Sequence, residues 1–242
     1  MTTPPRRIDT AMKREALLAS PFFRAMRTED LNEILGFATE RRFPRGTTIF
    51  DKGDPGTSMM AVLVGRVRAS NVSADGKELT LNVIGPGEVL GEIALLDGKP
   101  RSAAATAIED TTALVVERRQ FLPFLLKNEV MVERLLVVLC DRLRRTSASL
   151  EEIALLDLPV RLARLLLKLS ADYGRPVPGA DGGGTRIDIK LSQRDISTLV
   201  ASSRESVNKL LRTWREEGAV DLVDGHIIVR RPQALQALMQ SA

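Results

Sequence analysis

One segment of the sequence combines charges and glycines in a pattern that suits binding of a small charged ligand. The segment GEVLGEIALLDGKPRSAAATA starts at Gly87 and carries Glu92 and Arg101 in an apolar, alanine-rich run, with Gly91 and Ser102 directly beside them. The two charges either pair with each other on a surface loop, which contributes only about 0–1 kcal/mol, or hold an anion through charge-assisted hydrogen bonds. The glycines favour the ligand, because a surface ion pair does not require them. We expect a ligand-free pocket to be partly solvated or closed by Glu92, since an unpaired buried guanidinium is costly.

A second group of residues, near the C-terminus, has the pattern of a helix-turn-helix. Ser192 with Asp195 predicts the start of one short helix, and Ser202 with Glu205 predicts the start of another, each as a capping box. Apolar residues in the second helix recur at i, i+3, i+4 and i+7, which is typical of a buried stripe. That stripe consists of Val207, Leu210, Leu211 and Trp214, and the residues left facing outward are Arg204, Glu205, Asn208, Lys209 and Arg212.

The outward-facing side chains of this second helix suit the major groove of DNA. Arginine can donate to guanine O6 and N7, and glutamate can accept from the amino group of cytosine. Ser192, Gln193 and Ser203 lie near helix N-termini, where phosphates bind. The alternative is a solvated helix face with i,i+4 pairs such as Glu205–Lys209. Gly225 predicts a turn between AVDLV and HIIVR, which together would form a small β wing.

The candidate ligand segment lies within a β-rich region from Glu40 to about Val116. Short alternating or β-branched runs are separated there by turn sequences such as KGDPG, ADGKE and GPGE. This spacing predicts an antiparallel barrel or jelly roll. Two amphipathic helices precede the region, in DTAMKREALLAS and in TEDLNEILGFAT, and Thr28 opens the second. MTTPPRR at the N-terminus reads as a loose leader.

A long helix is predicted after the β-rich region. A short helical piece interrupted by Pro123 comes first, followed by almost thirty residues from Glu129 without glycine or proline. Apolar residues there alternate steps of three and four, which is an a/d seam. The seam comprises Leu136, Leu139, Leu143, Thr146, Leu150 and Ile153. We expect it to meet a second copy of the chain in a parallel dimer, although packing back onto the barrel is the alternative.

A hinge is predicted at residues 158–159, because Asp157 can cap the next helix and Pro159 lies in its first turn. PVRLARLLLKLSADYG then predicts an amphipathic helix, RPVPGADGGGT a flexible loop, and TRIDIKL a strand.

Composition excludes several other functions. A chain of 242 residues suits two domains, and its net charge of +4 gives only weak support to a polyanionic partner. Cys140 is the single cysteine and His226 the single histidine, so iron–sulfur, zinc and non-haem iron sites are not expected. No membrane-spanning run or signal peptide is evident, which predicts a cytoplasmic protein. No nucleophile–base pair or phosphate loop indicates an enzyme.

Taken together, these features make the sequence resemble the CRP/FNR family of transcription regulators. Three separated motifs match in the family's order: GEIALLDGKPRSA, RRTS within the long helix, and SSRESVNKLL. The resemblance implies an α+β protein with an N-terminal jelly-roll β-barrel that binds a cyclic nucleotide, a long dimerisation helix and a C-terminal winged helix-turn-helix. The implied domains are residues 1–126, 127–157 and 158–242.

The resemblance also implies the roles of individual residues in a cyclic-nucleotide site. Glu92 would accept a hydrogen bond from the ribose 2′-hydroxyl, while Arg101 and Ser102 would bind the cyclic phosphate. The backbone around Gly91, Glu92 and Ile93 would line the sugar–phosphate pocket. On the long helix, Arg142, Thr146 and the partner subunit's Ser147 would lie near the base, which accounts for a hydroxyl in the seam. The effector would be cAMP, with cGMP as the alternative, and no metal is implied.

The DNA-reading residues implied by the resemblance are Arg204, Glu205 and Lys209. They would read a palindrome with TGTGA-like half-sites about 34 Å apart. Double-stranded DNA, RNA polymerase and a second copy of the chain are the implied partners. Lys209 replaces an arginine and Ala201 replaces a glycine of the family pattern. A regulator of the same fold that senses another signal, or none, is the competing hypothesis.

Overall fold

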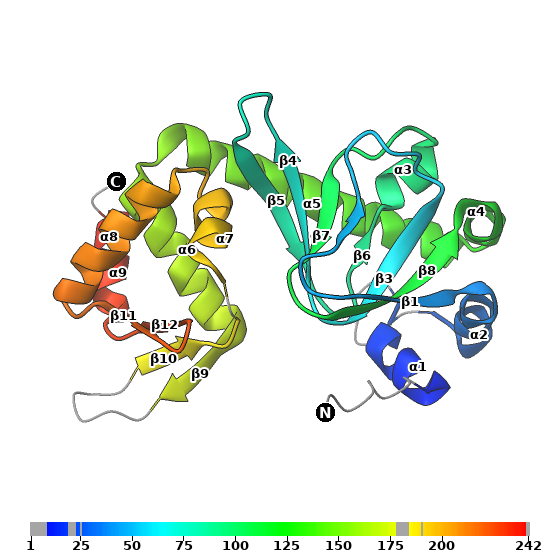
Figure 1. Cartoon of the computed structure of the whole chain (residues 1–242). Coiled ribbons are helices and arrows are strands. Elements are labelled where there is room, and N and C mark those ends of the chain that lie inside the picture. The colour runs from blue at the N-terminus through cyan, green and yellow to red at the C-terminus, as the bar shows by residue number, and fades with distance from the viewer. Residues whose placement is uncertain (1–8, 19–22, 25, 178–183, 190, 241–242) are drawn as a thin grey trace. The chain divides into compact units, whose positions relative to one another are not determined.

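The computed structural model describes residues 9–18, 23–24, 26–177, 184–189 and 191–240 (Figure 1). Contacts divide the chain into two compact units. The first unit comprises Met1–Val72 and Leu81–Arg144, and the second comprises Ser73–Thr80 and Arg145–Ala242. The helices are α1 (Thr10–Leu18), α2 (Thr28–Phe37), α3 (Glu92–Asp97), α4 (Arg118–Leu126), α5 (Glu129–Leu155), α6 (Leu158–Tyr173), α7 (Gln193–Leu199), α8 (Arg204–Glu216) and α9 (Pro232–Gln240). The strands are β1 (Thr39–Phe43), β2 (Thr48–Phe50), β3 (Ser58–Val64), β4 (Val67–Val72), β5 (Glu78–Ile84), β6 (Val89–Leu90), β7 (Ala104–Ala107), β8 (Thr111–Glu117), β9 (Gly174–Val177), β10 (Gly184–Ile187), β11 (Val220–Val223) and β12 (His226–Val229).

The β-rich region forms the predicted jelly roll. One sheet has the strand order β1-β8-β3-β6 and the other β2-β7-β4-β5. Strand β3 shows how the sheets create two cores, because successive side chains point to opposite faces. Met60 and Val62 join a core built from both sheets, which is the barrel interior. Met59 and Ala61 join a second core that also contains helix residues.

This second core holds the helices of the first unit against the β1-β8-β3-β6 sheet. Leu17 of α1, Leu31 of α2, Phe121 of α4 and Met131 of α5 are all buried in it. Helix α2 begins at Thr28, the residue predicted to open it, and Arg27 occupies the N-cap without a side-chain cap hydrogen bond. One prediction needs correction here. Helix α4 is not interrupted but includes Pro123. The N-terminal leader lies outside the described residues.

The predicted long helix is α5, a continuous helix of 27 residues. Its buried side chains, Met131 and Leu135, belong to the barrel-side core. Most of the predicted seam faces solvent, since Leu143 and Leu150 are each 68% exposed. Leu139 is the exception, because it packs against the same core. An exposed apolar row of this length is typical of a protein interaction site.

The C-terminal part of the second unit is a winged helix-turn-helix. Helices α6, α7 and α8 share a core with strands of the β11-β12-β10-β9 sheet. The predicted wing is confirmed as β11 and β12, joined by Asp224 and Gly225 with φ of 51° and 77°. These are the positive φ values that a type I′ hairpin turn requires. The segment predicted as a flexible loop instead begins with β9, which pairs with β10; residues 178–183 lie outside the described residues.

The three helices α6, α7 and α8 of this unit differ in how their N-termini are capped. Ser192 and Asp195 form the predicted capping box of α7. The second predicted box is wrong: α8 is capped by Ser203, whose Oγ accepts from the Ser206 amide. Ser202 is used in the turn, where its amide donates to the Ser197 carbonyl oxygen after Ala201 at φ 50°. At α6, Asp157 occupies the N-cap but its side chain makes no cap hydrogen bond.

Candidate functional site

The candidate ligand segment places a glycine where β6 passes into α3. Gly91 has φ 79°, a left-handed conformation that side chains other than glycine rarely adopt. A Cβ atom at this position would lie 2.4 Å from Arg101 Nη1 and 3.2 Å from the Ser58 carbonyl oxygen. Glycine is therefore required both for the turn and for the approach of Arg101. This is the physical reason for the glycine beside Glu92.

Arg101 is held inside the barrel wall by groups from three segments. Its Nη1 donates to the Gly91 carbonyl oxygen at 2.9 Å, and its Nη2 donates to Ser58 Oγ at 3.2 Å. The guanidinium carbon lies 4.2 Å from the centroid of the Phe50 ring, a cation–π distance. Arg101 is only 5% exposed. Burial lowers the pKa of this guanidinium, and the negative charges of Glu92 and Asp54 oppose that shift.

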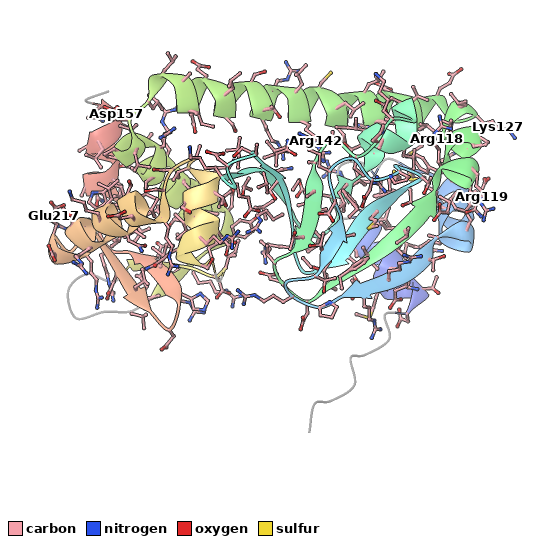
Figure 2. All side chains as sticks on the ribbon, turned by 45° about the horizontal axis from the view of Figure 1, so that its top comes forward. Arg118, Arg119, Lys127, Arg142, Asp157 and Glu217 are labelled. Carbon is pink, nitrogen blue, oxygen red and sulfur yellow. The ribbon has the colours of Figure 1, made fainter. Side chains whose placement is uncertain are left out.

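Glu92 is fully buried and its carboxylate pairs with the long helix rather than with Arg101. Arg142 lies in the middle of α5 (Figure 2). It donates from Nη1 to Glu92 Oε1 and from Nη2 to the Val89 carbonyl oxygen at 2.9 Å. The expectation that Glu92 itself would close the pocket over Arg101 is thus corrected. A surface pair between the two charges of the segment is also ruled out, because both are buried.

The site leaves two buried polar atoms without hydrogen-bond partners. They are Glu92 Oε2, an acceptor, and Arg101 Nε, a donor. A buried unsatisfied group typically costs about 1–3 kcal/mol, and more when it is charged. Glu92 Oε2 can therefore accept, and Arg101 Nε can donate, one further hydrogen bond. A ligand with one anionic group and one hydroxyl would make both hydrogen bonds.

The remaining predicted ligand residues lie at more open positions. Ser102 and Ile93, the latter in the first turn of α3, are both exposed. Thr146 and Ser147 are exposed on α5, one turn beyond Arg142. Sequence reasoning missed Ser58 and Phe50. Both precede Arg101 by more than 40 residues in ordinary strand sequences, and only the barrel register brings them to it.

The predicted DNA-reading helix is α8. Arg204, Glu205 and Lys209 are exposed on it, while Val207, Leu211 and Trp214 are buried as predicted. Asn208 differs from its prediction, because it is half-buried and its Oδ1 lies buried without a partner. The predicted phosphate contacts Ser192 and Ser203 cap α7 and α8, and Gln193 is the first residue of α7.

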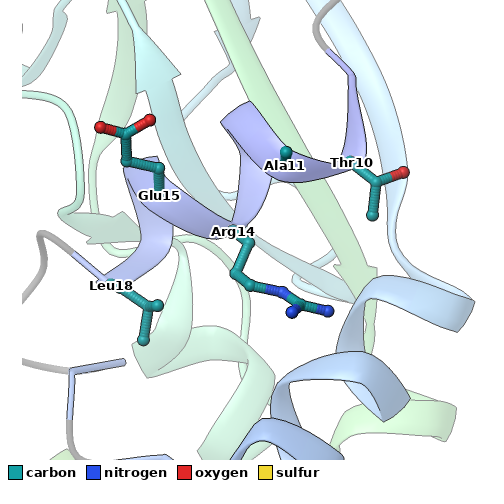
Figure 3. Close-up of a pocket in the computed structure, with 5 residues that line it drawn as sticks. All are labelled: Thr10, Ala11, Arg14, Glu15 and Leu18. Carbon is teal, nitrogen blue, oxygen red and sulfur yellow. The ribbon is translucent and has the colours of Figure 1, made fainter.

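Other features of the described residues offer no competing chemical centre. A hollow of about 700 Å³ lies along α1, lined by Thr10, Ala11, Arg14, Glu15 and Leu18 (Figure 3). It contains none of the predicted site residues. The described part of the chain has no cluster of three metal-ligating side chains. None of its helices has both the length and the apolar character needed to cross a bilayer.

Comparisons with known proteins match both parts of the chain. Residues 40–128 match the cyclic nucleotide-binding domain, and residues 160–238 match the Crp-like helix-turn-helix domain. A CRP-like cAMP-activated global transcriptional regulator of Mycobacterium tuberculosis is 33% identical over 193 residues, covering 80% of this chain and 84% of the relative. The cyclic AMP receptor protein of Thermus thermophilus is 32% identical over 219 residues, covering 90% and 96%.

A solved structure supports the same assignment. A CRP-family transcriptional regulator of Thermus thermophilus matches with a TM-score of 0.70 and 27% identity, covering 84% of this chain and 97% of that one. The α+β architecture found here, a β-rich N-terminal domain followed by a long helix and a helix-turn-helix, agrees with this likeness. The chain therefore belongs to the CRP/FNR family of transcription regulators, which are not enzymes.

Proposed function

We propose that this chain is a homodimeric transcription regulator whose binding to palindromic DNA responds to a cyclic nucleotide, cAMP or cGMP. The observation that carries the proposal is the buried pair of Arg101 and Glu92, each of which keeps one buried polar atom able to make a further hydrogen bond. A cyclic nucleotide has the matching groups. Its phosphodiester is an anion for Arg101 Nε, and its ribose 2′-hydroxyl is a donor for Glu92 Oε2.

Arg142 connects the proposed site to the long helix. Because Arg142 uses Glu92 Oε1, the other carboxylate oxygen is left for a ribose hydroxyl. A ligand that binds Glu92 therefore also affects Arg142 on α5. It shifts the equilibrium between the DNA-binding conformation and the non-binding conformation only to the extent that it binds one of them more tightly. We propose that Ser102 contacts the phosphate, and that Thr146 and the partner subunit's Ser147 contact the base.

The exposed row on α5 supports dimerisation, and the exposed face of α8 supports readout of DNA. A two-fold dimer would present two copies of α8 to half-sites one helical turn apart. We propose TGTGA-like half-sites, with Arg204, Glu205 and Lys209 on the bases and Ser192, Gln193 and Ser203 on phosphates. RNA polymerase is the proposed further partner. The proposed domains are residues 1–126, 127–157 and 158–242.

Calorimetric titration with cAMP and with cGMP, followed by a DNA shift assay with each, tests the proposal. Arg101→Ala should weaken nucleotide binding by at least about 10-fold, because hydrogen bonds to charged groups contribute about 1.5–3 kcal/mol each. Arg119→Ala is the matched control, since Arg119 is exposed on α4. DNA binding that still responds to nucleotide in Arg101→Ala contradicts the gating model.

The competing function is a regulator of the same fold that responds to another signal or binds DNA constitutively. One observation favours it: Arg142 already pairs with Glu92, so the carboxylate is not left without a counter-charge. Relatives with other names support it as well, such as an anaerobic regulatory protein of Bacillus subtilis, 27% identical over 212 residues. Binding of neither cAMP nor cGMP, together with specific DNA binding, would establish this alternative.

A further inference from the structure

A third buried polar atom without a partner lies in the wall of the same barrel. Asn71 is on β4, and its Oδ1 is buried with no hydrogen-bond partner. Alternate residues of a strand share a face. Val67 belongs to the barrel-interior core and Ala69 packs against it, so the side chain of Asn71 belongs to the interior face as well. An unsatisfied amide oxygen on an apolar inner wall is costly unless something binds it.

The strand register places Asn71 close to Arg101. Ala69 pairs with Ala105, and Ser70 pairs with Ala104, the first residue of β7. Asn71 therefore comes next on β4 at the end where the chain passes from Arg101 into β7. Arg101 stacks on Phe50, which pairs with Ala105 of β7. Ala105 also pairs with Ala69, which lies two residues before Asn71 on the same face of β4. Asn71 and Arg101 therefore border the same interior space.

Building on the proposed function, we propose that Asn71 Oδ1 accepts a hydrogen bond from an N–H group of the nucleotide base. An amide oxygen only accepts, so its partner must be a donor. In a cyclic nucleotide, the phosphate would bind Arg101 and the 2′-hydroxyl would donate to Glu92. The hydrogen-bond donors that remain are the N–H groups of the base. Asn71 thereby selects bases that carry such a group, and it is a specificity residue of the barrel wall.

The test compares three ligands by calorimetry on the full-length protein. The ligands are cAMP, cGMP and purine riboside 3′,5′-cyclic monophosphate, whose base has no N–H group. The wild-type protein should bind cAMP or cGMP about 3- to 10-fold more tightly than the purine analogue, the effect of one hydrogen bond. Asn71→Leu should remove this preference while leaving the affinity for the purine analogue unchanged. Val72→Ala, 58% exposed on the opposite face of β4, is the matched control and should keep the preference.

The outcomes separate this inference from the proposed function. If the wild-type protein binds all three ligands equally, or if Asn71→Leu weakens all three by one factor, the inference is wrong and the proposed function stands. If the wild-type protein binds none of the three, both are wrong. The wild-type preference is measured without any variant, so the inference stays testable even if Asn71→Leu misfolds.

Discussion

At the scale of single residues, Arg142 stabilises the buried negative charge of the candidate site. Glu92 is fully buried, and Arg142 is the cation that pairs with it in the structure. Breaking a buried ion pair from one side leaves an uncompensated charge, whereas removing both charges is often close to neutral. Arg142 thus neutralises the buried Glu92 carboxylate, a role that was not predicted from its place in the sequence of the long helix.

Arg142→Ala should destabilise the ligand-free protein by about 3 kcal/mol, the lower end for a buried pair, because the Arg142 side chain is 27% exposed. Combining it with Glu92→Gln should recover most of that loss, since a neutral amide needs no counter-ion. Urea unfolding of both single variants and the double variant at one protein concentration gives the coupling free energy. Additive effects of the two substitutions would show that the pair does not contribute to stability.

At the scale of elements, the start of α5 is tied to α2 through polar side chains. Arg27 Nε donates to Asp30 Oδ2 at 3.0 Å, and Asn128 Oδ1 accepts from the Met131 amide at the first turn of α5. The Arg27 hydrogen bond, with a further one from Asn128, holds the pKa of the Asp30 carboxyl below its usual value, against desolvation that raises it. Asn128 thereby caps the first turn of α5 and links it to Asp30 of α2.

Asp30→Asn should reduce stability at neutral pH by about 0.5–1 kcal/mol, a small effect because Arg27 is 77% exposed. A depressed folded-state pKa adds stability that is complete above the unfolded pKa of about 3.9 and is lost as pH falls through the folded value. The difference in Tm between the wild-type protein and Asp30→Asn should therefore shrink below about pH 4. Glu29→Gln, the neighbouring exposed acid, serves as control and should show no such trend.

At the scale of the whole molecule, patterns that repeat along one element could be predicted from the sequence. The jelly roll, the long helix, the buried stripe of α8 and the Asp-Gly wing turn all follow from local periodicity or turn chemistry. What could not be predicted depends on contacts between distant segments: Ser58 and Phe50 around Arg101, Arg142 on Glu92, and Leu139 in the barrel-side core. The shift of the α8 cap from Ser202 to Ser203 has a local cause: a serine caps a helix without a glutamate three residues later, and the turn at Ala201 places Ser203 at the start of α8.

The exposed apolar row of α5 leads to a prediction about assembly. Leu143 and Leu150 are one heptad apart in the seam and are each 68% exposed, so a charge at either should be tolerated in a monomer but buried in a dimer. Leu143→Glu with Leu150→Glu should convert a dimer to a monomer in sedimentation experiments and remove high-affinity binding to a palindromic site. Ala148→Glu, on the face of α5 away from the seam, should change neither property. A double variant that stays dimeric would place the interface elsewhere, and dimerisation through α5 would then have to be abandoned.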